Sequence, residues 1–72
     1  MIDREADIVF EAEHVYVFRV GAGDYEIRSH HATHSVVIGR RRGRDDIARA
    51  VAIRAADRLN RYPRQINKVF PP

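Results

Sequence analysis

The sequence predicts an α+β fold, in which an antiparallel meander of three to four strands packs on one C-terminal helix. As far as residue 39, apolar residues gather in short segments rich in β-branched and aromatic side chains, which are typical of strands. From Asp45 onward they recur every three to four residues, as in an amphipathic helix. A chain of 72 residues buries only about 60% of its surface, so we expect one domain over residues 1–72 with one small core.

The predicted strands cover residues 8–10, 14–20, 24–28 and 35–39. The segment 14–20 has apolar side chains on both of its alternating faces, which indicates an interior strand. Gly21 and Gly23 tolerate positive φ angles and predict a hairpin turn into the segment 24–28, where polar and apolar residues alternate. A polar loop of residues 29–34 then leads to the last strand.

The predicted helix begins at Asp45 and ends before Pro63, because the residue that precedes a proline is driven out of the α region. The stripe expected to dock on the sheet is formed by Ile47, Val51, Ala55 and Leu59, with Ala48, Ala52 and Tyr62 alongside. Beside one edge of this stripe lie Arg54, Arg58 and Arg61. The helix is thus expected to have an apolar face toward the sheet and a basic edge.

Composition favours the cytoplasm. The chain has no cysteine, so neither a disulfide framework nor a cysteine zinc site is available to it. Its first residues are polar and acidic, which is the reverse of a basic and then apolar signal peptide. No apolar run approaches the roughly 18 residues that a membrane span needs. We therefore expect a cytoplasmic protein without a membrane partner.

Charge is divided unevenly along the chain. Residues 1–35 carry seven acids against three arginines, a net charge of −4, and residues 36–72 carry nine arginines and one lysine against three acids, a net charge of +7. Such a basic half favours an acidic or polyanionic partner. Twelve of the thirteen basic residues are arginine, whose guanidinium group makes bidentate contacts with phosphate and carboxylate.

The densest positive segment is the run Gly39–Arg44, which is expected to join the last strand to the helix. It predicts a site for phosphates or for an acidic protein face, while a solvated linker kept soluble by charge is the alternative. The residues predicted to bind nucleic acid or an acidic partner are Arg19, Arg28, Arg40, Arg41, Arg42, Arg44, Arg54, Arg58 and Arg61.

Metal binding and catalysis are not expected. His30, His31 and His34 lie within five residues, but no cysteine or carboxylate flanks them, and a strand followed by a loop does not place them on one side. They are interpreted as a solvated loop. The carboxylates are scattered and no nucleophile elbow, phosphate loop or zinc-protease motif occurs. The sequence therefore predicts a non-enzymatic protein without a cofactor.

Three segments of the chain resemble a known DNA-binding architecture: Tyr25-Glu26-Ile27-Arg28, Ser35-Val36-Val37-Ile38-Gly39, and the helix from Asp45-Asp46-Ile47 through Ala55-Ala56 to Leu59. Over about residues 15 to 61 they look like the plant ethylene-response-factor domain and the related phage integrase amino-terminal domains. That family reads the DNA major groove with the outer face of a three-stranded sheet. The resemblance implies that Arg19 and Arg28 occupy outward sheet positions. The general build is also similar to small phage-encoded inhibitors such as anti-CRISPR proteins, which implies binding to a protein as the alternative.

The last expectation concerns assembly. If Tyr16, Phe18 and Val20 face the helix, then Val15 and Val17 lie on the open face of the sheet, where a second copy or a protein partner would bury them. Ile53 falls outside the expected docking stripe and is a further candidate for partner contact. Alternatively, the tail formed by residues 64–70 covers the open face with Ile66, Val69 and Phe70 and leaves the protein a monomer.

Overall fold

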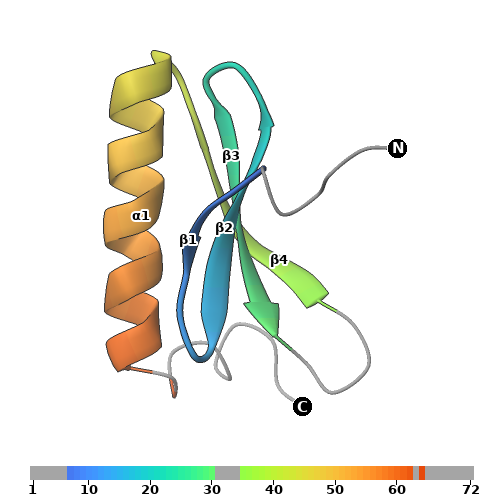
Figure 1. Cartoon of the computed structure of the whole chain (residues 1–72). Helices are drawn as coiled ribbons and strands as arrows, with labels where there is room; N and C mark the ends of the chain where they lie inside the picture. The colour runs from blue at the N-terminus through green and yellow to red at the C-terminus, as the bar shows by residue number, and fades with distance from the viewer. Residues whose placement is uncertain (1–6, 31–34, 63, 65–72) are drawn as a thin grey trace.

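The computed structural model describes residues 7–30, 35–62 and 64. Their elements are β1 (Ile8–Glu11), β2 (Val15–Gly21), β3 (Asp24–His30), β4 (Ser35–Arg42) and α1 (Asp45–Arg61). The four strands form one antiparallel sheet in the order β1-β2-β3-β4, and α1 lies lengthwise against one face of it (Figure 1). The predicted α+β meander with one C-terminal helix is confirmed. In the part of the chain that the structure describes, no helix has the length and apolarity to cross a membrane.

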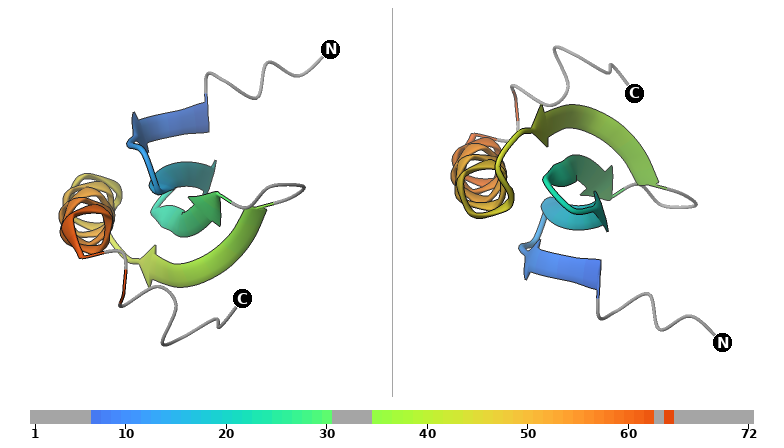
Figure 2. Two further views of the ribbon diagram at one scale, coloured as in Figure 1. Left: turned by 90° about the horizontal axis from the view of Figure 1, so that it is seen from below. Right: turned by 90° about the horizontal axis from the view of Figure 1, so that it is seen from above.

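The core lies between α1 and the middle of the sheet. Figure 2 shows α1 beside β2 and β3, with β1 and β4 on the two sides of this central pair. The buried apolar cluster is formed by Val15, Val17, Tyr25, Ile27, Ala48, Ala52 and Ala56. Large side chains thus come from the strands and methyl groups from the helix, which lets the helix lie close to the sheet.

The helix docks through the alanine side of the expected stripe, with Ala48 and Ala52 from that stripe and Ala56 beyond it. Ala48, Ala52 and Ala56 are its buried residues, whereas Ile47 is 56% exposed and Val51 is 44% exposed. The sheet already presents large buried side chains, so small helical residues fit against it better than branched ones. The predicted stripe of large apolar residues consequently lies toward one flank of the helix, and part of it remains in contact with water.

The orientation of β2 also differs from the expectation. Val15 and Val17 are both 0% exposed and pack in the core, because the register pairs Val17 with Ile27 on the face covered by the helix. Their expected place on the open face is therefore wrong. Ile53 is half-buried and packs against the same core cluster, so it is not an isolated surface residue either. With Val15 and Val17 in the core, the open face of β2 presents Tyr16 and Phe18 instead, and association with a second copy stays a prediction.

Two strands are longer than predicted. β3 continues to His30 and β4 to Arg42, so Arg40–Arg42 belong to a strand instead of a linker. In the register, Arg42 is opposite Asp24 and Arg40 is opposite Glu26, and such pairs of opposite charge stabilise neighbouring strands. The predicted roles of His31, His34 and residues 65–70 fall outside the described residues.

Candidate functional site

The alternation of side chains along β4 divides its arginines between the two faces of the sheet. Arg41 is in register with Tyr25, whose side chain is buried under the helix, so Arg41 lies on the helix side. Arg40 and Arg42, one position to either side, point to the opposite face. The run that looked like one positive cluster in the sequence is therefore two separate groups in space.

On that opposite face, both arginines meet the same carboxylate. Arg40 donates from Nε and from one terminal guanidinium nitrogen to the two oxygens of Asp24, each at 2.9 Å. Arg42 Nε lies 3.5 Å from Oδ1 of the same residue. The hydrogen bond and the charge of Arg40, followed by the charge of Arg42, hold the pKa of Asp24 below its ordinary value. These two arginines already have an anionic partner.

The two sheet arginines implied by the family resemblance occupy different faces. Arg28 lies on the outward face, as implied: its Nε donates to Glu26 at 3.1 Å, and its guanidinium lies 4.3 Å from the centroid of the Phe18 ring. Arg19 does not lie outward. It is in register with the buried Tyr25, and its guanidinium reaches Asp45 of the helix at 3.5 Å. The outward face thus presents one arginine of this pair, and a carboxylate already contacts it.

The remaining paired arginines lie at the two ends of the helix. Arg44 Nε is 3.1 Å from Asp46, and Arg61 is 2.7 Å from Asp57, one helical turn earlier. The predicted arginines with a carboxylate partner are therefore Arg19, Arg28, Arg40, Arg42, Arg44 and Arg61.

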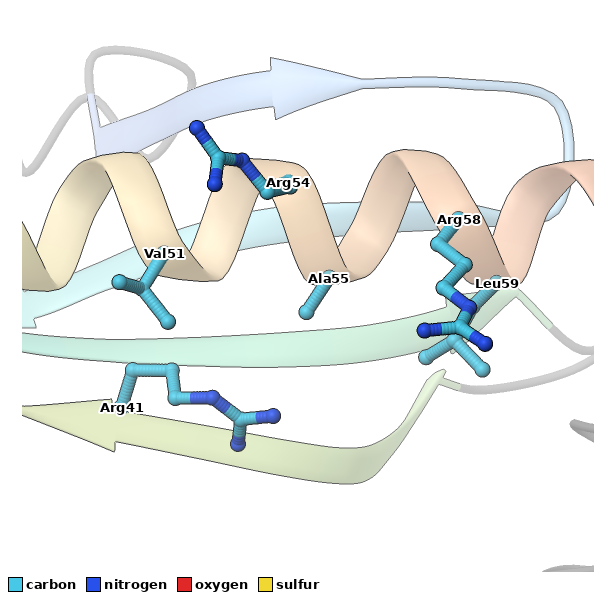
Figure 3. Close-up of a pocket in the computed structure, with 6 residues that line it drawn as sticks. All are labelled: Arg41, Val51, Arg54, Ala55, Arg58 and Leu59. Atoms are coloured by element: carbon cyan, nitrogen blue, oxygen red, sulfur yellow. The ribbon is translucent and has the colours of Figure 1, made fainter.

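Arg41, Arg54 and Arg58 have no carboxylate partner among the residues that the structure describes. They line the same groove, which lies between β4 and α1 and has a volume of about 410 Å³ (Figure 3). Its other lining residues are Val51, Ala55 and Leu59. We call this site the α1–β4 groove: its floor is apolar, and the charged side chains that line it in the described part of the chain are all cationic.

Figure 3 shows how the side chains are arranged. Val51 and Ala55 point from the helix toward β4, and Arg41 extends along β4 on the opposite side of the groove. Arg58 turns toward the groove beside Leu59, whereas Arg54 points away from β4 and lies on the rim. Arg41 also donates a hydrogen bond of 2.8 Å to the carbonyl oxygen of Arg40, which fixes the direction of its guanidinium. The groove therefore has a cation on each wall and a third at its outer edge.

Sequence reasoning found the three arginines of the groove but missed its floor. Val51, Ala55 and Leu59 were assigned to the docking face because their spacing is helical. Only the exposure of Ile47 and Val51 in the folded chain reveals that this stripe borders solvent. Arg49 and Arg64 also lack a carboxylate partner within the described residues, and neither lines the groove.

The predicted histidine loop is described only at its start. His30 ends β3, and its ring centroid is 4.8 Å from that of Tyr16. Over residues 7–30, 35–62 and 64, no three histidine or carboxylate side chains gather in a way that would hold a metal ion. The interpretation of His31 and His34 as solvated residues stays a prediction.

No protein-family model, curated protein or solved structure matches this chain.

Proposed function

We propose that this protein is a small non-enzymatic module that binds nucleic acid through the α1–β4 groove. The observation that supports the proposal is the gathering of Arg41, Arg54 and Arg58 around one groove without a carboxylate partner among the described residues. Guanidinium groups bind phosphate in bidentate geometry, and each phosphate they neutralise releases counterions into solution. An arginine without a carboxylate partner breaks no ion pair when it binds a phosphate, so the whole free energy of the phosphate contact adds to the affinity.

This proposal narrows the binding site predicted from the sequence. Arg40, Arg42 and Arg44 each contact a carboxylate, so a phosphate would have to compete with Asp24 or Asp46 for them. Arg41 is the member of the run that belongs to the groove. Binding is therefore expected to depend on one arginine of the strand and two of the helix rather than on the whole run.

A second candidate function is binding to an acidic surface of another protein, as an inhibitor would. The apolar floor favours it, since Val51 and Leu59 offer a place for apolar side chains of a partner. Interfaces of this kind combine a water-excluding centre with charged groups at the rim. The two candidates predict different ligands for the same residues, so one set of variants tests both.

The test compares two variants that lose the same charge. Arg54→Gln/Arg58→Gln removes two groove arginines, and Arg40→Gln/Arg44→Gln removes two that are paired with carboxylates. We assume that each of the three groove arginines neutralises one phosphate. A plot of the logarithm of the binding constant against the logarithm of the salt concentration then has a slope of about −2.7 for duplex DNA or about −2.1 for a single strand. Fluorescence anisotropy with labelled oligonucleotides measures this slope.

We expect the groove variant to lose about two thirds of the slope and the matched control to keep it. Equal losses in the two variants would show that net charge alone attracts nucleic acid and would reject the groove. Absence of binding to every oligonucleotide at low salt would reject the proposed function itself.

A further inference from the structure

The floor of the α1–β4 groove is the feature that binding to a phosphate backbone leaves unexplained. Val51 is 44% exposed, and Ala55 and Leu59 are half-buried beside it. Apolar surface in water is unfavourable, and a ligand that covers it gains free energy in proportion to the area buried. A duplex presents phosphates and sugars outward while its base faces are stacked inside. It would contact the cationic rim and leave this floor in water.

A single strand differs because its bases unstack and expose flat apolar faces. The groove volume of about 410 Å³ lies in the range of sites that hold one small organic ligand, so it has room for about one nucleotide. Each base in a strand is flanked by phosphates along the backbone. A base seated on the floor therefore places phosphates near the cations on the two walls.

The charge of the lining also favours a nucleic acid strand over an acidic peptide. Among the residues that the structure describes, every charged one that lines the groove is an arginine. An acidic peptide also meets a positive patch, but it brings backbone N–H and C=O groups that need hydrogen-bond partners, which the side chains of Val51, Ala55 and Leu59 do not supply. A lining with one sign of charge and an apolar floor suits a ligand that is uniformly anionic and carries a flat apolar group at each repeat.

We infer that the α1–β4 groove binds single-stranded nucleic acid, with one base against Val51 and Leu59 and the adjoining phosphates at Arg41 and Arg58. Arg54 lies one helical turn before Arg58 on the rim of the groove, where its positive charge attracts the strand as it leaves the groove. This inference rests on the proposed function, because it assumes that the groove arginines bind phosphates.

The experiment uses four probes with the full chain: a labelled single strand, a hairpin duplex of the same composition, an abasic strand with the same number of phosphates, and an acidic amphipathic peptide. We expect the single strand to bind about tenfold more tightly than either the duplex or the abasic strand, because only its base buries the apolar floor. Phosphate contacts are common to all three nucleic acids.

Variants of the floor complete the test. Val51→Ser and the isosteric Val51→Thr remove apolar contact without a change of charge, and Ile47→Ser is the matched control at an exposed position outside the groove. We expect both Val51 variants to bind the single strand about fivefold or more weakly than the native chain does. Their affinities for the duplex and the abasic strand, and the salt slope, are expected to stay unchanged. Ile47→Ser keeps the affinity of the native chain. Thermal melting confirms that each variant is folded.

The outcomes distinguish a failure of the single-strand inference from a failure of nucleic-acid binding as a whole. If the duplex binds as tightly as the single strand and Arg54→Gln/Arg58→Gln weakens both, nucleic-acid binding stands and the single-strand inference is overturned. If Val51→Ser weakens the binding of all three nucleic acids alike, the floor does not hold a base and the inference is again overturned. If only the peptide binds, the proposed function fails and the acidic protein partner replaces it.

Discussion

The hydroxyl of Tyr25 donates a hydrogen bond of 2.8 Å to Oδ1 of Asp45, the first residue of α1. The same oxygen accepts a bond of 2.8 Å from the backbone N–H of Gly23 and a longer one of 3.5 Å from Arg19. Arg44, at the N-cap position, makes no capping bond with its side chain. One carboxylate therefore ties the turn between β2 and β3 to the start of the helix, and this link positions α1 relative to the sheet.

The link between Tyr25 and Asp45 is testable by a double-mutant cycle. Tyr25→Phe is expected to lower the free energy of unfolding by about 1 kcal/mol in the native chain, since it removes one hydrogen bond from a buried residue. In a chain that already carries Asp45→Ala, the same change is expected to have nearly no effect. Urea denaturation measures both values. A full effect of Tyr25→Phe in the Asp45→Ala background would show that the two residues are not coupled.

Acid is expected to destabilise the fold through Asp45 and Asp24. The hydrogen bond from Gly23, followed by that from Tyr25 and the charge of Arg19, holds the pKa of Asp45 below its ordinary value, and Arg40 does the same for Asp24. Because these pKa values are lower in the folded state, the stabilisation is present above the unfolded-state pKa of about 3.9 and is lost as the pH falls through the folded-state values.

Urea denaturation midpoints measured from pH 6 downward report this loss of stability. The loss is expected to begin at about pH 3.9. Asp24→Asn/Asp45→Asn is expected to be less stable than the native chain at neutral pH and to show a flatter decline in acid. A decline as steep as that of the native chain would place the acid sensitivity at other carboxylates.

Gly23 is expected to be irreplaceable in the turn between β2 and β3. Its φ angle is +69°, and a Cβ atom there would lie 2.0 Å from the carbonyl oxygen of Gly43. Gly43 also donates a hydrogen bond of 2.9 Å to the carbonyl of Gly23, so the two backbones are held together. Gly23→Ala is expected to lower the free energy of unfolding by at least about 2 kcal/mol.

The matched control is Gly21→Ala, since a Cβ atom at Gly21 meets nothing within 4 Å. We expect a change within about 1 kcal/mol for this variant. Similar losses in the two variants would mean that the close approach of Gly23 and Gly43 does not limit the turn.

The docking face of the helix is tested by one buried and one exposed position. Ala52 is fully buried against the sheet, so Ala52→Leu is expected to destabilise the protein by about 1–3 kcal/mol through overpacking. Ile47→Ala is expected to change stability by less than about 0.5 kcal/mol, because this side chain is largely in water. The docking face predicted from the sequence would give a large loss at Ile47, and thermal denaturation of both variants separates the two orientations.

Local signals were enough to assign the elements of the fold. The spacing of apolar residues and the acidic start predicted a helix from Asp45, and Pro63 predicted its end, close to the observed Asp45–Arg61. The glycines at 21 and 23 predicted the hairpin between β2 and β3. These features depend on residues that are near one another in the chain, so the sequence by itself determined them.

The tertiary structure decided which surfaces these elements present. Asp24 and Arg40 are 16 positions apart, and only the register of β3 against β4 brings them together and turns Arg41 toward the helix. The docking face of α1 depended on which residues fill the space above the sheet, a matter of volume that the helical period does not encode. The sequence determined the elements and the excess of arginine, whereas long-range pairing and packing decided which arginines remain without a carboxylate partner in the described part of the chain and left Val51 exposed among them.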